Sequence, residues 1–163
     1  MSKISVIGAG SVGATVANDL LIQGIASEIV LIDINHKKAK SEALDVYQGA
    51  PFQSPAVVRS GQYEDTAGSD IVVITCGVAR KPGMSRLDLA QTNVDIIKDV
   101  AKIVPQYAPD AVYIIVSNPV DVLTYVFTKL SGLPERQIIG SGTILDTSRL
   151  QAELARRFCI SPK

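Results

Sequence analysis

The fold of this chain is decided by residues 4–13, which read ISVIGAGSVG. A short run rich in β-branched residues, 4–7, leads directly into glycines at positions 8, 10 and 13, and an apolar helical pattern follows from Gly13. This order predicts a buried strand, a tight turn and a helix that packs back on the strand. Such a unit is typical of the start of a doubly wound α/β fold.

The three glycines have distinct expected roles in such a loop. Gly8 permits the tight turn, Gly10 lets the backbone approach a pyrophosphate, and Gly13 lets the helix pack closely on the strand. The free backbone N–H groups at the start of the helix, at Ser11 and Val12, would hold the anion. The glycine spacing alone is weak evidence, because glycines also occur in ordinary turns.

An acidic residue at the expected distance strengthens the dinucleotide hypothesis. Asp33 lies twenty residues after Gly13, at the end of the second apolar run, 29–32. A carboxylate there accepts hydrogen bonds from the adenine ribose hydroxyls and repels a 2′-phosphate. The sequence therefore predicts NAD rather than NADP as the cofactor. We interpret the single histidine, His36, as part of a solvated helix start or of the adenine rim, and not as a catalyst.

The rest of the chain alternates between strand and helix patterns. Continuous apolar runs, typical of strands covered on both faces, occur at 4–7, 29–32, 56–58, 71–74, 112–116 and 138–139. Helical apolar patterns occur at 13–25, 37–48, 87–104 (closed by Pro105), 120–130 and 147–158. The alternation predicts an α/β fold with a doubly wound parallel sheet of six strands, the Rossmann fold.

Composition excludes several classes of protein. The 163 residues include 16 Lys plus Arg and 16 Asp plus Glu, and this zero net charge argues against nucleic acid or an anionic membrane as the main partner. The hydrophobic fraction of 47% excludes disorder, yet no uncharged stretch reaches the roughly 20 residues that a membrane span needs. Cys76 and Cys159 lie far apart without metal-ligand spacing, so we expect reduced thiols in a cytoplasmic protein, with neither a disulfide nor a metal site.

A cationic loop follows the fourth predicted strand. Residues 75–89 combine glycines and a proline with Arg80, Lys81 and Arg86, and a helix is predicted from about Leu87. In a doubly wound sheet this loop lies at the carboxyl edge, where ligands bind. We interpret Lys81 as solvated, and Arg80 and Arg86 as parts of a lid that closes on an anionic substrate.

Together these motifs resemble the N-terminal half of the lactate/malate dehydrogenase family, the NAD-dependent 2-hydroxy-acid dehydrogenases. The resemblance covers nearly the whole chain, from Ile4 to Phe158. The matching segments are the glycine loop 8–13, Asp33, 49–52 (Gly-Ala-Pro-Phe), 80–89, Asn93, 117–121 (Ser-Asn-Pro-Val-Asp) and 140–149. Several such segments in the right order are far more specific than the glycine loop alone.

The resemblance implies roles for further residues. Arg86 looks like the lid arginine that polarises the substrate carbonyl, and Asn118 resembles the asparagine that contacts the nicotinamide side and the substrate oxygen. Arg149 resembles the arginine that grips the substrate carboxylate bidentately, and Asp146 the acid that orients the catalytic histidine. Without the resemblance, Asp146 and Arg149 would be interpreted as an i,i+3 surface ion pair. Pro119, after Asn118, could hold a cis peptide bond.

Arg80 bears on which 2-hydroxy acid is the substrate. In the family, the matching position faces the variable end of the substrate; arginine there looks like malate dehydrogenase, and glutamine looks like lactate dehydrogenase. An arginine would pair with the second carboxylate of malate or oxaloacetate. The segment 81–86 is also malate-like, whereas Leu87 is common on the lactate side. We therefore expect malate/oxaloacetate, with L-lactate/pyruvate as the alternative.

The family's catalytic histidine lies in a Gly-Glu-His-Gly-Asp segment that this sequence does not contain. We accordingly expect residues 1–145 to form the NAD-binding domain, and residues 146–163 to begin the helix that leads into a substrate domain outside this sequence. The chain alone is expected to bind NAD and to be inactive. The parent enzyme is expected to be a homo-oligomer, and the fragment to self-associate through exposed Leu145, Leu150 and Leu154.

A hypothesis of another class is a non-catalytic NAD-binding or NAD-sensing module. Such a module has no use for three arginines, Arg80, Arg86 and Arg149, around a pocket for a small acid. A substrate analogue such as oxamate would discriminate, because a sensor would be indifferent to it.

Overall fold

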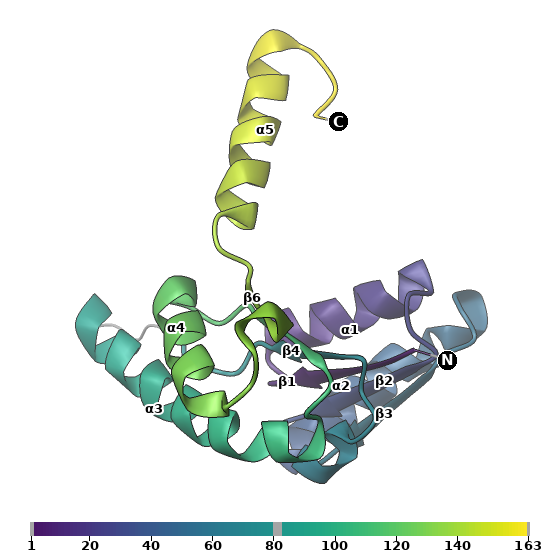
Figure 1. Cartoon of the computed structure of the whole chain (residues 1–163). Helices are drawn as coiled ribbons and strands as arrows, with labels where there is room; N and C mark the ends of the chain where they lie inside the picture. Colours follow the sequence, from purple (N-terminus) through teal and green to yellow (C-terminus); the bar gives the residue numbers. More distant parts are fainter. Residues whose placement is uncertain (1, 80–82, 163) are drawn as a thin grey trace.

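Six parallel strands form one sheet in the computed structural model, which describes residues 2–79 and 83–162. In chain order they are β1 (Lys3–Ile7), β2 (Glu28–Ile32), β3 (Val57–Gly61), β4 (Ile71–Ile74), β5 (Val112–Ile115) and β6 (Ile138–Gly140). Their order across the sheet is β3-β2-β1-β4-β5-β6. The doubly wound parallel sheet predicted from the sequence is confirmed (Figure 1).

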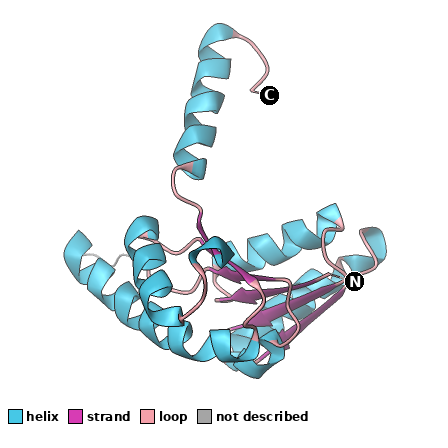
Figure 2. Ribbon diagram, in the orientation of Figure 1, coloured by secondary structure: helices cyan, strands magenta, loops and turns pink. Residues whose placement is uncertain are grey.

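Helices cover both faces of this sheet (Figure 2). They are α1 (Ser11–Gln23), α2 (His36–Gln48), α3 (Arg86–Tyr107), α4 (Val120–Ser131) and α5 (Ile144–Phe158), with 3-10 turns η1 (Ala50–Phe52), η2 (Tyr63–Thr66) and η3 (Glu135–Gln137). The buried residues of α1 and α2 belong to one core, and those of α3 and α4 belong to another. Because both faces are covered, the central strands read as continuous apolar runs.

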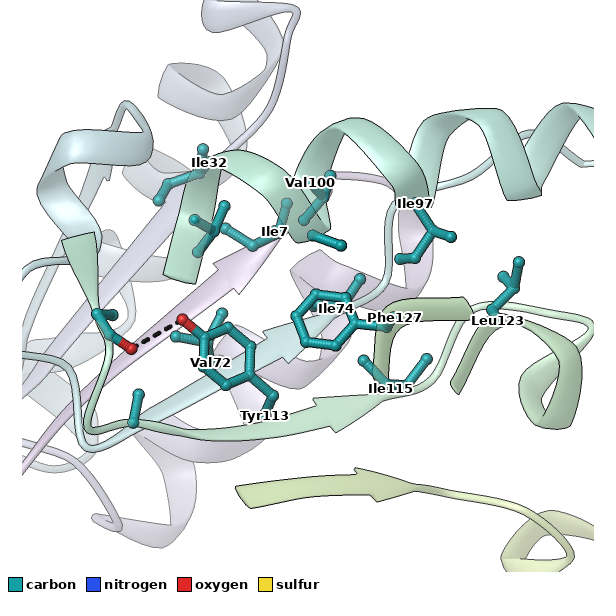
Figure 3. Packing of buried hydrophobic residues seen from close by; sticks show 14 of the residues in the cluster. Ile7, Ile32, Val72, Ile74, Ile97, Val100, Tyr113, Ile115, Leu123 and Phe127 are labelled. Carbon is teal, nitrogen blue, oxygen red and sulfur yellow. Dashed lines mark hydrogen bonds between the residues drawn. The ribbon is translucent and has the colours of Figure 1, made fainter. Parts of the chain in front are cut away.

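The two cores lie on opposite faces because side chains alternate along each strand. On β1, Val6 belongs to the core with α1 and α2, and Ile7 belongs to the core with α3 and α4. In the second core, the fully buried rings of Tyr113 and Phe127 have centroids 5.2 Å apart (Figure 3). The Tyr113 hydroxyl donates to the carbonyl of Ala108 at 2.9 Å, so its polar atom is satisfied despite burial.

Several boundaries differ from the sequence-based prediction by one or two residues, as in α1 (11–23 rather than 13–25), and three differ by three residues at one end. α3 does not end before Pro105 but continues to Tyr107; Pro105 lies in the last turn, where its buried ring packs and only one helical hydrogen bond is missing. β3 spans 57–61 rather than 56–58, because polar residues continue this edge strand. α5 begins at Ile144, three residues earlier than predicted, in a turn with no buried apolar face to reveal it.

α5 extends away from the rest of the described chain (Figure 1). Ala155 is the one buried residue of this helix, whereas Leu145, Leu150 and Leu154 are 58%, 60% and 43% exposed. The predicted division between domains at residue 145 falls within the first turn of α5 and stays a prediction.

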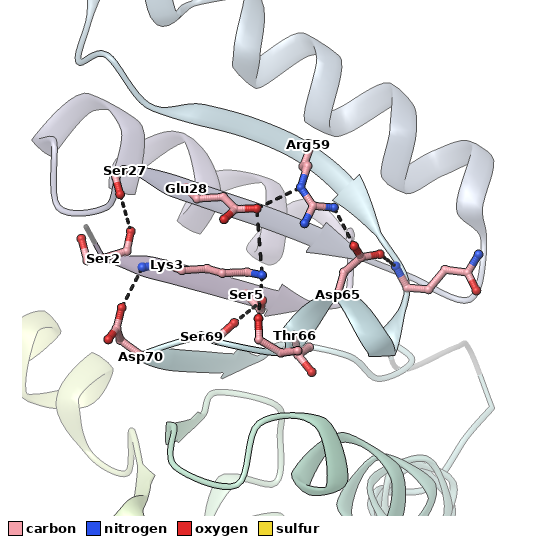
Figure 4. A network of polar contacts seen from close by, with 12 residues as sticks. Ser2, Lys3, Ser5, Ser27, Glu28, Arg59, Asp65, Thr66, Ser69 and Asp70 are labelled. Carbon is pink, nitrogen blue, oxygen red and sulfur yellow. Dashed lines mark hydrogen bonds and ion pairs between the residues drawn. The ribbon is translucent and has the colours of Figure 1, made fainter.

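A polar network fixes the edge strand β3 to its neighbours (Figure 4). Arg59 on β3 donates to Glu28 on β2 at 2.9 Å and to Asp65 in η2 at 2.8 Å. The backbone N–H of Gln62 also donates to Asp65, at 2.8 Å. The Gln62 N–H and the Arg59 guanidinium hold the pKa of Asp65 below its ordinary value.

This lowered pKa predicts a pH-dependent contribution to stability. Because the pKa of Asp65 is lower in the folded chain than the value of about 4 expected when unfolded, Asp65 stabilises the fold above that pH. The contribution is lost as the pH falls through the lowered, folded value. Asp65→Asn should therefore lower the Tm at neutral pH, and the difference from wild type should shrink on acidification. Thermal unfolding followed by circular dichroism checks this; a Tm difference that does not change with pH would contradict it.

Candidate functional site

A cleft opens at the carboxyl edge of the sheet, beside the point where the strand order reverses between β1 and β4. Its volume is about 330 Å³. It is lined by Gly8 and Gly10 of the glycine loop, by Asp33 after β2, and by Thr75 and Cys76 after β4. Ligands of doubly wound sheets bind in this crevice, so the topology singles out the cleft as the candidate site.

The glycine loop is held closely between its neighbours. Gly8 has φ +106°, and a Cβ there would lie 2.6 Å from the backbone nitrogen of Cys76. A Cβ on Gly13 would lie 1.8 Å from the carbonyl oxygen of Gly8 and 2.8 Å from Oγ1 of Thr75. Only glycine fits at these two positions, and the tight turn and close helix–strand approach expected from the sequence are present in the fold.

Gly10 has a different environment. A Cβ there would meet nothing within 4 Å, and its backbone (φ −77°, ψ −177°) is extended. Gly10 is the N-cap residue of α1 and supplies no side-chain cap, so the first-turn N–H groups, including those of Ser11 and Val12, have no partner within the helix. An anion in this open space would receive these donors and the favourable end of the helix dipole.

Asp33 both faces the cleft and braces the loop. Its Oδ2 accepts the backbone N–H of Ala9 at 2.8 Å, and its Oδ1 accepts the N–H of Asn35 at 2.8 Å. A carboxylate oxygen can accept a second hydrogen bond, so capacity for ribose hydroxyls remains. The bond to Ala9 was not predicted from the sequence, because the spacing of residues does not show which oxygen faces which loop.

Two residues on the floor of the cleft were missed as site residues in the sequence. Oγ1 of Thr75 lies 3.1 Å and 2.9 Å from the carbonyl oxygens of Ile7 and Gly8, and its hydroxyl ties the glycine loop to the end of β4. Burial raises the pKa of the Cys76 thiol to about 12, so this side chain is a neutral wall of the cleft and not a nucleophile. Their position directly after a buried strand was the available signal.

Part of the cleft is lined by apolar or aromatic side chains, beside the charged Lys38 and Asp99. Ile34, Tyr63, Ile96 and Val100 line it, and burial raises the pKa of Tyr63, so its phenol stays neutral. An adjoining depression of about 300 Å³ shares Ile34 and Tyr63 and is also lined by the exposed His36. His36 is the exposed first residue of α2, as expected for a solvated helix start, and its position beside an adenine stays a prediction.

The loops after β4 and β5 are joined by side-chain hydrogen bonds. Ser117 Oγ lies 2.6 Å from the carbonyl oxygen of Cys76. Asn93, from α3, donates to the carbonyl of Asn118 at 2.8 Å and accepts the N–H of Val78 at 2.8 Å. Asn118 itself is exposed, and the peptide bond that follows it is cis, as the sequence allowed.

The arginines expected around a substrate are not brought together by the described chain. Arg80 lies outside the described residues. Arg86 is the exposed first residue of α3. Arg149 lies on α5, where its Nη1 is 3.1 Å from Oδ1 of Asp146, and the two side chains are 68% and 75% exposed. α5 extends away from the sheet, and in the described chain this pair is an exposed i,i+3 ion pair, the alternative given above. The roles expected of Arg86, Asn118 and Arg149 at a substrate stay predictions.

Across residues 2–79 and 83–162, no group of three or more His, Cys, Asp or Glu side chains is placed to hold a metal ion. In the same ranges, no helix is long and apolar enough to cross a membrane. Cys76 and Cys159 are both free thiols.

The arrangement of the cleft fits an extended dinucleotide. Open space at the start of α1 suits a pyrophosphate, the carboxylate of Asp33 suits a ribose diol, and the apolar part around Ile34 and Val100 suits a flat base. All three features belong to the same cleft.

Comparison with known proteins agrees with this geometry. Residues 2–140 match the family described as lactate/malate dehydrogenase, NAD binding domain, so the cofactor is NAD. The L-lactate dehydrogenase of Clostridium botulinum (strain Hall) is 54% identical over 162 residues, 99% of this chain and 51% of the relative. L-lactate dehydrogenase 1 of Clostridium acetobutylicum is 53% identical over 157 residues, 96% of this chain and 50% of the relative. The chain spans about half the length of the curated relatives it matches.

Solved structures of both substrate types are similar to this chain. The minor L-lactate dehydrogenase from Enterococcus mundtii matches with a TM-score of 0.95 and 41% identity, over 99% of this chain and 52% of that one. The malate dehydrogenase from Picrophilus torridus matches with a TM-score of 0.93 and 40% identity, over the same shares. The fold alone therefore does not separate lactate from malate.

Substitutions at Gly13 and Gly10 should separate folding from cofactor binding. Gly13→Ala places a methyl group 1.8 Å from the Gly8 carbonyl oxygen, so we expect a lower Tm and loss of NADH binding with it. In Gly10→Ala the methyl meets no atom within 4 Å, so the Tm should stay near wild type. The methyl would obstruct the anion space, and we expect NADH binding to weaken about tenfold or more, the loss of one hydrogen bond to a charged group. Thermal unfolding and NADH fluorescence titration measure the two effects; undiminished binding by Gly10→Ala would refute the assignment of this space.

Proposed function

The chain belongs to the lactate/malate dehydrogenase family, and we propose that it is the NAD-binding half of an L-lactate dehydrogenase, which transfers a hydride between NAD(H) and the C2 carbon of pyruvate or L-lactate. The observation that supports this choice is 54% identity, over nearly the whole chain, to proteins named L-lactate dehydrogenase. It favours lactate over the malate expected from the sequence motifs, because those motifs cover only a short loop.

The nicotinamide, when bound, supplies or accepts the hydride. The described residues bind and orient the rest of the cofactor. The start of α1 holds the pyrophosphate beside Gly10, Asp33 accepts hydrogen bonds from the adenine ribose, and the apolar part around Tyr63 covers the base. Asp33 is the carboxylate proposed to accept the ribose hydroxyls, and it selects NAD because it repels a 2′-phosphate.

Residues of the loops and of α5 are proposed to bind the substrate. Arg86 polarises the carbonyl, Asn118 contacts the same oxygen, Arg149 grips the carboxylate, and Asp146 orients a histidine contributed by the rest of the polypeptide. For this, the ion pair between Arg149 and Asp146 must open. Exposed i,i+3 pairs of this kind are weak, so little free energy opposes the rearrangement.

Malate dehydrogenase is the second candidate, and one residue favours it. Arg80 has the charge that a second substrate carboxylate requires, and it would lie unpaired over the methyl group of pyruvate. The two candidates share the cofactor, the reaction type and every other proposed residue. They differ only in the group at the variable end of the substrate.

Steady-state kinetics of the intact protein that contains this domain decides between the candidates. We expect a higher kcat/KM for pyruvate than for oxaloacetate with NADH. Arg80→Gln should raise the ratio of the two kcat/KM values about 10- to 100-fold in favour of pyruvate, because oxaloacetate loses a charged hydrogen-bond partner. A preference of the wild type for oxaloacetate would overturn the lactate proposal in favour of malate. No turnover of either acid, together with indifference of the NADH complex to oxamate, would favour a sensing module.

We also propose that the apolar stripe of α5 is covered by the rest of the polypeptide in the intact protein, and that the 163-residue chain alone associates with copies of itself. The stripe consists of Leu150, Leu154 and Phe158, at i, i+4 and i+8, and all three are exposed. Leu145, at the start of the helix, is exposed as well. An unpartnered row of large apolar side chains favours association.

Sedimentation velocity should therefore show concentration-dependent association of the 163-residue chain. Leu150→Glu combined with Leu154→Glu should restore a monomer, because two charges interrupt the stripe without affecting the core. Val122→Glu is a matched control, since Val122 is an exposed apolar residue on α4 and should leave the association unchanged. A wild-type chain that stays monomeric at high concentration would exclude this proposal.

A further inference from the structure

We propose that Asn93 is a positioning residue that sets the spacing between the loops after β4 and β5 and thereby holds Asn118 in its place. The inference rests on the proposed dehydrogenase function, because that function assigns Asn118 to the substrate oxygen. Asn93 lies on α3, two helical turns after Arg86.

The side-chain amide of Asn93 joins α3 to both loops. Asn93 is 4% exposed. Its Oδ1 accepts the N–H of Val78 at 2.8 Å, and its Nδ2 donates to the carbonyl of Asn118 at 2.8 Å. Nδ2 also lies 3.5 Å from the carbonyl oxygen of Val78. These partners fix the orientation of the amide, because only its oxygen can accept from an N–H and only its nitrogen can donate to a carbonyl.

The backbone of the loop after β4 is fitted closely around this amide. Gly77 has φ +156°, and a Cβ there would lie 3.1 Å from Oδ1 of Asn93. Such a distance is shorter than nearly all real Cβ contacts, so a side chain at position 77 would displace the amide. The absence of a side chain at Gly77 thus allows Val78 to approach Asn93 closely enough for the hydrogen bond.

Ser117 also links the two loops, but closer to the ends of the strands. Its Oγ lies 3.2 Å from the carbonyl oxygen of Ile74 and 2.6 Å from that of Cys76, where the loops leave the sheet. Asn93 is hydrogen-bonded to residues further along each loop, Val78 and Asn118. Loss of the Asn93 amide should therefore leave the sheet edge intact and release Asn118.

The glycine loop of the cofactor cleft does not depend on these bonds, because Thr75 and Asp33 hold it. Asn93 does not line the cleft, but Val78, which it holds, does. In a variant that keeps the bond to Val78, a positioning role on the substrate side therefore predicts a defect in turnover with little change in NADH affinity. A residue that merely stabilised the domain would not produce that difference.

Two variants of the intact protein distinguish the effect of the hydrogen bond to Val78 from that of the hydrogen bond to Asn118. Asn93→Asp keeps an acceptor for the Val78 N–H and removes the donor to Asn118, whereas Asn93→Leu removes both. Ile97→Ala is the matched control, because Ile97 is buried on the same helix in the core and contacts neither loop through hydrogen bonds. Amide hydrogen exchange, the dissociation constant for NADH, and kcat and KM for pyruvate and oxaloacetate are measured for each.

We expect both Asn93 variants to lose about 10- to 100-fold in kcat with the preferred acid, the effect of a small misplacement at a reacting centre. The NADH dissociation constant should stay near wild type in Asn93→Asp, which keeps the bond to the cleft-lining Val78. Exchange of the Val78 amide should rise about tenfold in Asn93→Leu and stay protected in Asn93→Asp. Kinetic losses no larger than in Ile97→Ala, or an equal loss of NADH affinity in Asn93→Asp, would overturn the inference. If the wild type turns over neither acid, the proposed function fails; unchanged exchange of Val78 in Asn93→Leu would separately overturn the link between Asn93 and the loop.

Discussion

The close approach of α1 to the carbonyl oxygen of Gly8 is the constraint on which the site depends. A single methyl group at Gly13 would occupy the space of that oxygen, so the helix start and the strand end are in direct backbone contact. This contact aims the free N–H groups of the first turn at the edge of the sheet. Thr75 and Asp33 then hold the loop from two neighbouring strands, so the anion space is fixed before any ligand enters it.

The rest of the site is assembled by the parallel sheet. Because all strands point the same way, the residues that follow β1, β2, β4 and β5 reach one edge although they are far apart in sequence. Side chains there bond chiefly to backbone groups of the neighbouring loop, as Asn93 does to Val78 and Asn118. Such bonds fix the spacing of the loops, which suits the proposed placement of a cofactor beside a substrate.

α5 shows that a local sequence pattern can predict a helix without revealing what the helix packs against. The spacing of Asp146 and Arg149 is equally compatible with a substrate clamp and with a surface ion pair, and in the described chain the pair is exposed. A helix with one buried residue has no core to orient it. The substrate-side roles proposed for these residues would therefore require packing that the described chain does not itself provide.

The sequence by itself determined the strand–helix alternation, the glycine loop and the choice of cofactor, because these follow from local apolar periodicity and from the sterics of single residues. Gly13, Asp33 and the six strands could all be found in this way. The continuation of α3 through Pro105, the bracing of Ala9 by Asp33 and the bridge through Asn93 were decided only by the tertiary structure. Each depends on atoms from segments far apart in the chain, whose separation is fixed only when the sheet and its helices pack together.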